Sequence, residues 1–165
     1  MSVNKYQPHV FVLPEDDANL QIANGFHLHV PWNRQRRMQV LPVAGGWIKV
    51  LDQFHSNHID KMESNSGRFM VLLIDLDGIE GRLAEAKAKI PANLTDRVFI
   101  LSALTAPEAL RQAKLGSYED IGSAMAKDCH EESEIIWGHE LLQHNKIELD
   151  RLRARVRPIL FPSSE

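Results

Sequence analysis

Hydrophobic residues along this chain alternate between short continuous runs and longer stretches with helical periodicity. Four of the short runs have the length and continuity of β-strands, and they occupy residues 9–13, 38–43, 68–78 and 97–101. The third run is the most hydrophobic, and its residues 69–74 are all apolar. Such continuity is typical of a strand that is covered on both faces within a parallel sheet.

Between these runs, apolar residues recur at intervals of three and four, as they do on the buried side of a helix. The spacing predicts helices over residues 17–26, 47–62, 83–90, 107–115, 117–129 and 134–156. Ser117 and Asp120 have the spacing of a capping box, which predicts a helix start at this point. The apolar piece at residues 158–161 is interpreted as an edge strand or as a docked tail.

The alternation of strands and helices predicts an α/β fold, a Rossmann-like doubly wound sheet of about four parallel strands with helices on both faces. We expect the common strand order 2-1-3-4 in residues 1–106, which form the core. Residues 107–165 are expected to be a helical C-terminal extension that packs on the same domain. In such sheets the functional crevice lies outside the carboxyl ends of the strands.

Composition narrows the classes of protein to consider. The 165 residues suit one domain, and a net charge of −3 with 44% hydrophobic residues is ordinary for a globular protein. Cys129 is the single cysteine, which excludes an internal disulfide and any zinc site that needs two thiolates. The sequence has no signal-peptide pattern and no apolar stretch long enough to cross a membrane, so we expect a cytoplasmic protein without a membrane partner.

Carboxylates follow two of the predicted strands. Glu15 and Asp17 come after the first strand, and Asp75 and Asp77 come after the third. Residues two apart in an extended segment point the same way, so we expect Asp75 and Asp77 to project together and to face Glu15 or Asp17 across the sheet edge. Carboxylates this close repel each other unless a cation neutralises them, and hard oxygen ligands suit Mg²⁺ or Mn²⁺. The alternative is that these acids are loop residues that cap the next helix.

The order of these motifs resembles the TOPRIM domain, which occurs in type I and II topoisomerases, DnaG-type primases, RecR proteins and OLD-family nucleases. The resemblance covers residues 9–104 and rests on Glu15 after the first strand, a glycine-containing turn after the second, and Asp75-x-Asp77 after the third. It implies a metal-dependent, nuclease-like enzyme that hydrolyses phosphodiester bonds. Glu15 would be the general acid/base or a metal ligand, and Asp75 and Asp77 would be metal ligands.

The first motif departs from the family pattern, because Asp16 follows Glu15 directly and Asn19 stands near the second acidic place. This departure favours an alternative in which the chain is a non-catalytic binding or effector subunit of the same fold. A receiver-like phosphoacceptor domain is a third interpretation. For that domain, Asp16, Asp17, Asp75 and either Ser102 or Thr105 fill the expected places, but no strand with a preceding lysine follows residue 104.

Two clusters of arginine are the candidates for phosphate contact. We predict nucleic-acid binding by Arg34, Arg36, Arg37, Arg151 and Arg155; a solvated helix face is the alternative for the second cluster. DNA is the expected substrate in preference to RNA. The sequence has no P-loop, so a separate ATPase subunit would supply any motor, as in OLD-type defence systems, and a second copy of the chain is a further expected partner. His139 and His144 are five residues apart, which is not the spacing of a metalloprotease zinc helix, although either could position phosphate or water.

Overall fold

The computed structural model describes residues 2–105 and 107–162 and contains a four-stranded parallel sheet in the order β2-β1-β3-β4. The strands are β1 (His9–Pro14), β2 (Met38–Val40), β3 (Arg68–Asp75) and β4 (Val98–Ala103). This arrangement confirms the predicted α/β fold class, with β1 and β3 adjacent at the centre of the sheet. The predicted domain boundary after residue 106 falls at a residue outside the described ranges. Residues 163–165, the end of the predicted extension, also lie outside them.

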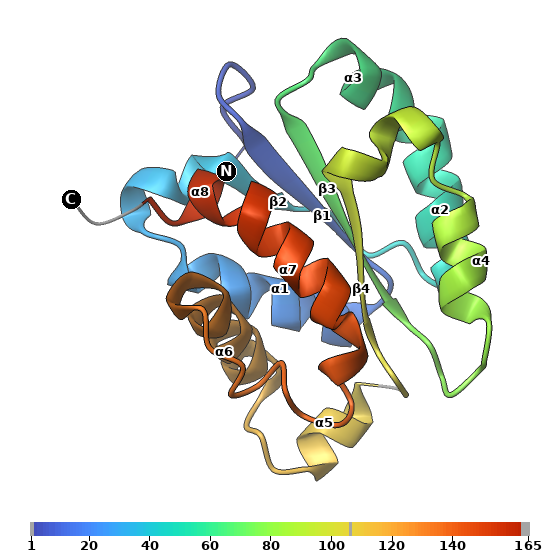
Figure 1. Cartoon of the computed structure of the whole chain (residues 1–165), viewed down its shortest axis with the longest axis vertical. Helices are drawn as coiled ribbons and strands as arrows, with labels where there is room; N and C mark the ends of the chain where they lie inside the picture. Colours follow the sequence, from blue (N-terminus) through green and yellow to red (C-terminus); the bar gives the residue numbers. More distant parts are fainter. Residues whose placement is uncertain (1, 106, 163–165) are drawn as a thin grey trace.

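Helices cover both faces of the sheet (Figure 1). One face packs against α2 (Trp47–Asn57), α3 (Ile59–Ser64) and α4 (Arg82–Ala88), together with the 3₁₀ turn η2 (Ala92–Arg97). The other face packs against α1 (Asp17–His29), α5 (Glu108–Gln112), α6 (Tyr118–Glu131), α7 (Lys146–Arg155) and α8 (Arg157–Leu160). Alternate residues of β1, β3 and β4 therefore enter two separate hydrophobic cores. No described helix has the length and apolar character required to span a bilayer.

Several element boundaries differ from the sequence-based expectation. The predicted helix over residues 47–62 is two helices, because the step from Phe54 to Ile59 is five residues and does not fit one helical face. β2 ends at Val40, although the Leu41 N–H still donates to the Val12 carbonyl at 2.8 Å. The capping box is confirmed: Ser117 Oγ accepts from the Asp120 N–H, and Asp120 accepts from the Ser117 N–H, both at 3.1 Å.

The largest correction concerns the C-terminal segment. The continuous helix predicted over residues 134–156 is wrong: residues 134–142 are irregular, and helix begins with the 3₁₀ turn η3 (Gln143–Asn145) and α7. The buried carboxylate of Asp128 explains part of this, because it accepts the N–H groups of Ile136 at 2.7 Å and Trp137 at 3.2 Å. The piece at 158–161 belongs mostly to α8 and forms no edge strand.

α7 occupies the place beside β4 where a fifth strand would pair. The side chains of Asn145 and Glu148 accept the outward N–H groups of Ser102 and Ile100 at 3.0 and 2.8 Å. These bonds satisfy the free edge of β4, which would otherwise expose unpaired backbone groups. Within the described residues the receiver-like interpretation therefore lacks its fifth strand.

Two glycines allow α1 and α6 to cross with their backbones in contact. A Cβ atom added to Gly25 would lie 2.0 Å from the carbonyl oxygen of Glu119, and one added to Gly122 would lie 1.8 Å from that of Ile22. Because both obstacles are backbone atoms, a side chain at either position must push the helices apart.

We expect Gly25→Ala to lower the free energy of unfolding by about 2 kcal/mol, since overpacking costs more than the gain in helix propensity. Urea unfolding measures the change. Asn24→Ala, an exposed change one residue away on the same helix, is the control and should stay close to the wild type. A Gly25→Ala protein as stable as the control would contradict the close helix crossing.

Candidate functional site

The carboxyl ends of β1 and β3 bring Glu15 and Asp75 into contact. Glu15 follows β1 directly, and its N–H donates to the carbonyl of Leu73 at 2.9 Å, which extends the pairing with β3. The Glu15 carboxylate in turn accepts the backbone N–H of Asp75 at 2.7 Å. The central position of both strands thus fixes the first two predicted site residues at one point of the sheet edge.

Asp75 is a buried acid surrounded by other acids. Asp75 is 3% exposed, and the side-chain amide of Asn19 donates to its Oδ1 at 3.3 Å. Asp16 caps α1 by accepting the Asn19 N–H at 3.0 Å, which holds a second carboxylate beside it. Burial, then the negative charges of Asp16 and Glu15, raise the pKa of Asp75 to about 8. Without a cation, this carboxyl is protonated at neutral pH.

Glu15 is half-buried, and its pKa is also raised. Burial is the main cause, and the negative charges of Asp16 and Asp77 add to it, whereas the hydrogen bond from the Asp75 N–H and the charge of Arg82 act in the opposite direction. A carboxyl group whose pKa moves toward neutrality is suited to proton transfer.

Asp77 reaches this region from a turn and not from the strand. β3 ends at Asp75, and Asp77 has φ of 50° and an exposed side chain. We expected Asp75 and Asp77 to project together because side chains two apart in a strand point the same way. That rule does not apply here, because Asp77 lies beyond the end of the strand. Asp77 instead forms an ion pair with Arg82, whose Nη1 lies 2.7 Å from its Oδ2.

Sequence reasoning missed Arg82, the first residue of α4. Its Nη1 also donates to the backbone carbonyl of Asp75 at 3.0 Å, and its guanidinium lies over the Trp47 ring with 4.9 Å to the centroid. The side chain is 10% exposed. The positive φ values of Gly78 and Gly81, 67° and 87°, let the chain turn back so that this arginine meets the acids. In the sequence, these glycines were the signal that could have pointed to Arg82. They indicate a turn, but they do not indicate that an arginine after the turn contacts the acids.

The structure does not bring the predicted phosphate-binding arginines to the acidic residues. Arg34, Arg36 and Arg37 lie in the 3₁₀ turn η1 (Trp32–Arg37), which enters β2 at its amino end. Arg151 donates to the carbonyl of Val98 at the start of β4, and Arg155 lies over the ring of Phe69 at the start of β3. Because β3 has eight residues, these groups and Asp75 lie at opposite ends of the sheet, roughly 20 Å apart. Asp17, the remaining predicted metal ligand, is exposed in the first turn of α1.

The donor set has the chemistry of a hard-cation site, but its members are already engaged. Among residues 2–105 and 107–162, no three His, Cys, Asp or Glu side chains are arranged to hold a metal ion. Glu15 is bound to the Asp75 N–H, and Asp77 is paired with Arg82. Carboxylate oxygens suit Mg²⁺ or Mn²⁺ by type. An ion that binds Asp77 at this position would have to break the ion pair between Asp77 and Arg82.

Comparisons with protein-family models, with curated proteins and with solved structures found no match.

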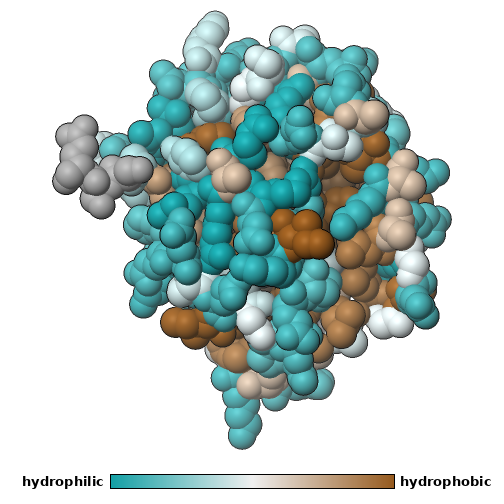
Figure 2. All heavy atoms as spheres, viewed as in Figure 1, coloured by the Kyte–Doolittle hydropathy of each residue, from teal (hydrophilic) through white to brown (hydrophobic). Residues whose placement is uncertain are grey.

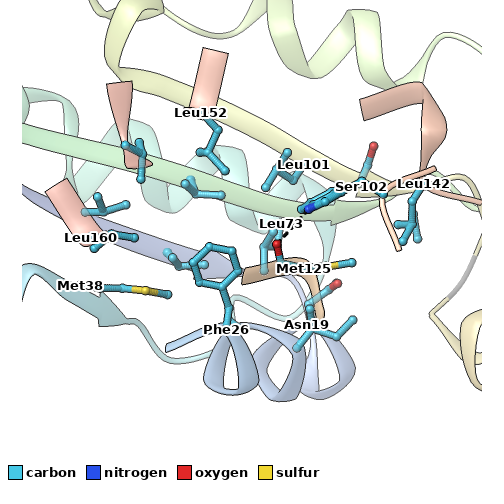
Figure 3. A pocket seen from close by; sticks show the side chains of 18 of the residues that line it. Asn19, Phe26, Met38, Leu73, Leu101, Ser102, Met125, Leu142, Leu152 and Leu160 are labelled. Carbon is cyan, nitrogen blue, oxygen red and sulfur yellow. Dashed lines mark hydrogen bonds between the residues drawn. The ribbon is translucent and has the colours of Figure 1, made fainter. Parts of the chain in front are cut away.

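A cavity of about 70 Å³ lies between the sheet and helices α1, α6, α7 and α8. Figure 3 shows Asn19 and Phe26 entering it from α1, and Leu152 and Leu160 entering it from the opposite side. Its lining is almost entirely aliphatic or aromatic, so a phosphate group would lose its hydration there without gaining partners. Of the residues that line the cavity, Asn19 is the one that bonds to Asp75 of the acidic site. The cavity is therefore a gap in core packing.

His144, which is half-buried, pairs with the buried Ser102 at the end of β4. Its Nε2 lies 2.9 Å from Ser102 Oγ, and burial lowers the pKa of His144, which keeps the imidazole neutral. Ser102 is 6% exposed, which leaves its hydroxyl out of reach of a substrate. His139 accepts the Leu141 N–H at 3.1 Å within its own turn. Both histidines therefore have structural partners, His144 in β4 and His139 within its own turn.

Proposed function

We propose that this protein is a Mg²⁺- or Mn²⁺-dependent hydrolase that cleaves phosphodiester bonds, with its site at the carboxyl ends of β1 and β3. The observation that carries the proposal is the burial of the Asp75 carboxyl against Glu15 and Asp16. Such an arrangement opposes folding at neutral pH, and a divalent cation is the partner that would offset the repulsion. Groups with strongly shifted pKa values are concentrated at functional sites.

The residues of this site have distinct proposed roles. Asp75 would be the main ion ligand, and Asn19 holds its orientation through the 3.3 Å hydrogen bond. Asp16 and Asp77 supply further carboxylates, and Glu15 exchanges a proton with the attacking water or the leaving group. A bound divalent ion would supply a lowered pKa for that water and charge stabilisation at the phosphate.

The TOPRIM resemblance extends the proposal to the substrate, the partner subunits and the biological role. It supports a nucleic-acid substrate, DNA in preference to RNA, and a role in genome defence beside a separate ATPase subunit. It also supports a cytoplasmic protein that acts with a second copy of itself. These extensions rest on analogy between folds and not on the site geometry.

A second candidate is a non-catalytic effector subunit. The observation that favours it is the ion pair between Arg82 and Asp77, which neutralises one of the proposed ligands. In that case the acids would serve protein contacts and the ion pair would be permanent.

A cleavage assay separates the two candidates. Supercoiled plasmid, single-stranded DNA and RNA are each incubated with the protein and Mg²⁺ or Mn²⁺, with chelator as the blank. We expect wild-type cleavage and a loss of at least about 100-fold in Glu15→Gln, because the proton-transfer group is removed.

The matched control is Glu80→Gln, an exposed glutamate in the turn that follows β3. It should cleave like the wild type. Equal rates in Glu15→Gln and Glu80→Gln would rule out the proposed role of Glu15. No wild-type cleavage of any substrate with either ion would favour the effector subunit.

A further inference from the structure

Arg82 is bound at the acidic site in a way that leaves part of its guanidinium free. The hydrogen bonds to Asp77 and to the Asp75 carbonyl both use Nη1. Nε is buried and has no hydrogen-bond partner among the described residues. A buried donor left without a partner is unfavourable, and at a site it indicates a partner that the described residues do not supply.

The position of Arg82 is held by contacts other than its ion pair. The Trp47 ring lies under the guanidinium, and the Asp75 carbonyl accepts from Nη1. If Asp77 turned away, both of these contacts would remain. The guanidinium would then stay beside Asp75 with its charge no longer compensated by Asp77.

Asp77 lies on the exposed turn that follows β3. It is exposed and has φ of 50°, and the next residue, Gly78, has φ of 67°. By contrast, Asp75 is buried and belongs to a central strand. The ion pair therefore joins a nearly buried arginine to an exposed carboxylate on a turn.

We propose that Arg82 is a displaceable internal cation: it pairs with Asp77 until a divalent ion takes that carboxylate, and its guanidinium then binds the phosphate of the nucleic-acid backbone. This inference rests on the function proposed above. It assigns to Arg82 the phosphate contact that the arginines at the amino ends of the strands are too far away to make. A planar guanidinium with free donors is well matched to phosphate oxygens.

Binding measurements on four proteins test the inference without requiring turnover. Mn²⁺ affinity is measured by calorimetry for the wild type, Asp75→Asn, Arg82→Gln and Arg68→Gln. Thymidine 3′,5′-bisphosphate, which has no phosphodiester bond to cleave, is then titrated into each Mn²⁺-loaded protein. Arg68 is the matched control because its guanidinium also lies over an aromatic ring, that of Phe11 at 4.7 Å, but at the amino end of the sheet.

We expect Arg82→Gln to bind Mn²⁺ about tenfold more tightly, because the competing cation is gone, and the bisphosphate about tenfold more weakly, because a charged hydrogen bond is lost. Arg68→Gln should change neither affinity. In nuclear magnetic resonance spectra, the Nε–H signal of Arg82, assigned by its absence in Arg82→Lys, should shift when Mg²⁺ is added to the wild type.

The outcomes separate the two proposals. Mn²⁺ binding that is lost in Asp75→Asn but unchanged in Arg82→Gln, with unchanged bisphosphate affinity, would overturn the role of Arg82 and leave the proposed metal site in place. Tighter Mn²⁺ binding without weaker bisphosphate binding would mean that Arg82 only neutralises charge, which also overturns the inference. Absence of Mn²⁺ binding in both the wild type and Arg82→Gln would overturn the metal-dependent function itself.

Discussion

Asp75→Asn is expected to stabilise the protein at neutral and alkaline pH and to abolish its binding of divalent ions. Burial and the neighbouring carboxylates raise the pKa of Asp75 to about 8 in the folded protein. In the unfolded chain an aspartate has a pKa of about 3.9. The folded state therefore holds this proton more tightly than the unfolded state.

The direction of the pH dependence follows from this difference. Below about pH 4 both states carry the proton, and Asp75 imposes no penalty. As the pH rises from about 4 to about 8, the unfolded state loses the proton first, so the free energy of unfolding falls throughout this window. Above about pH 8 the full penalty is present. Asparagine has no proton to lose and keeps the partner Asn19, so the variant avoids the penalty.

We expect Asp75→Asn to exceed the wild type in free energy of unfolding by on the order of 2–4 kcal/mol at pH 8, with the difference shrinking toward pH 4. Urea unfolding in the presence of chelator at several pH values measures it. Asp52→Asn, an exposed change on α2, is the control and should follow the wild type at every pH. A less stable Asp75→Asn protein at pH 8 would show that the buried carboxyl is not a source of strain.

Adding ion should reverse the order of stability. Mg²⁺ or Mn²⁺ binds the folded state and raises wild-type stability in proportion to the logarithm of ion concentration, whereas Asp75→Asn should not respond. Phosphodiester cleavage should fall by at least about 100-fold in the variant, because a primary ion ligand is lost. A stabilising substitution that removes activity is the pattern expected where an acid is retained for function.

Asn145→Ala is expected to cause the largest loss of stability outside the acidic site. The Asn145 side chain accepts the Ser102 N–H at 3.0 Å and donates to the Ser102 carbonyl at 2.8 Å and to the Leu142 carbonyl at 2.9 Å. All of these groups are buried. Removing the amide leaves the N–H and carbonyl of Ser102 without partners, and we expect a loss of about 3 kcal/mol.

The same substitution leaves the Ser102 N–H and carbonyl at the edge of β4 unpaired, while Glu148 still accepts the Ile100 N–H. A groove of about 320 Å³ already lies beside this edge between α4 and α7, and Ile90, Val98 and Ile100 contribute to its lining. Figure 2 shows the apolar surface that is open along this strip of the molecule. We therefore expect Asn145→Ala to aggregate more readily, because an unpaired strand edge can pair with another chain.

Urea unfolding measures the stability change, and hydrogen exchange at the Ser102 amide reports the lost bond directly. Gln143→Ala, an exposed change two residues earlier, is the matched control. An Asn145→Ala protein within about 0.5 kcal/mol of this control, with unchanged protection at Ser102, would mean that α7 does not support the strand edge.

Much of the fold could be predicted because its signals are local. A continuous apolar run predicts a buried strand, a three- and four-residue period predicts a helix, and the Ser117–Asp120 pair predicts a helix start; each pattern lies within a few consecutive residues. The strand order follows from general rules for parallel sheets, and the same rules predict that residues after the first and third strands meet at one edge. The proximity of Glu15 and Asp75 could therefore be anticipated although they are 60 residues apart.

Other features depend on contacts that no local pattern encodes. Asn145 and Ser102 are 43 residues apart, and nothing in either segment indicates that a helix will replace a fifth strand. The spacing of apolar residues over 134–156 predicted a helix. The backbone of residues 136 and 137 instead donates its N–H groups to the buried Asp128 carboxylate, and this is not helical pairing. The arginine clusters could be recognised as basic, but their position at the amino ends of the strands is set by where the strands begin.

By itself, the sequence determined the alternation of elements, the parallel sheet and the concentration of acids at its carboxyl edge, because periodicity and strand ends are properties of short segments. Only the tertiary structure decided that Asp77 leaves the strand, that Arg82 returns to neutralise it and that Asn145 and Glu148 close the edge of β4. These outcomes depend on which buried charges and backbone groups remain unpaired after the chain has folded, and that balance is set by the whole molecule.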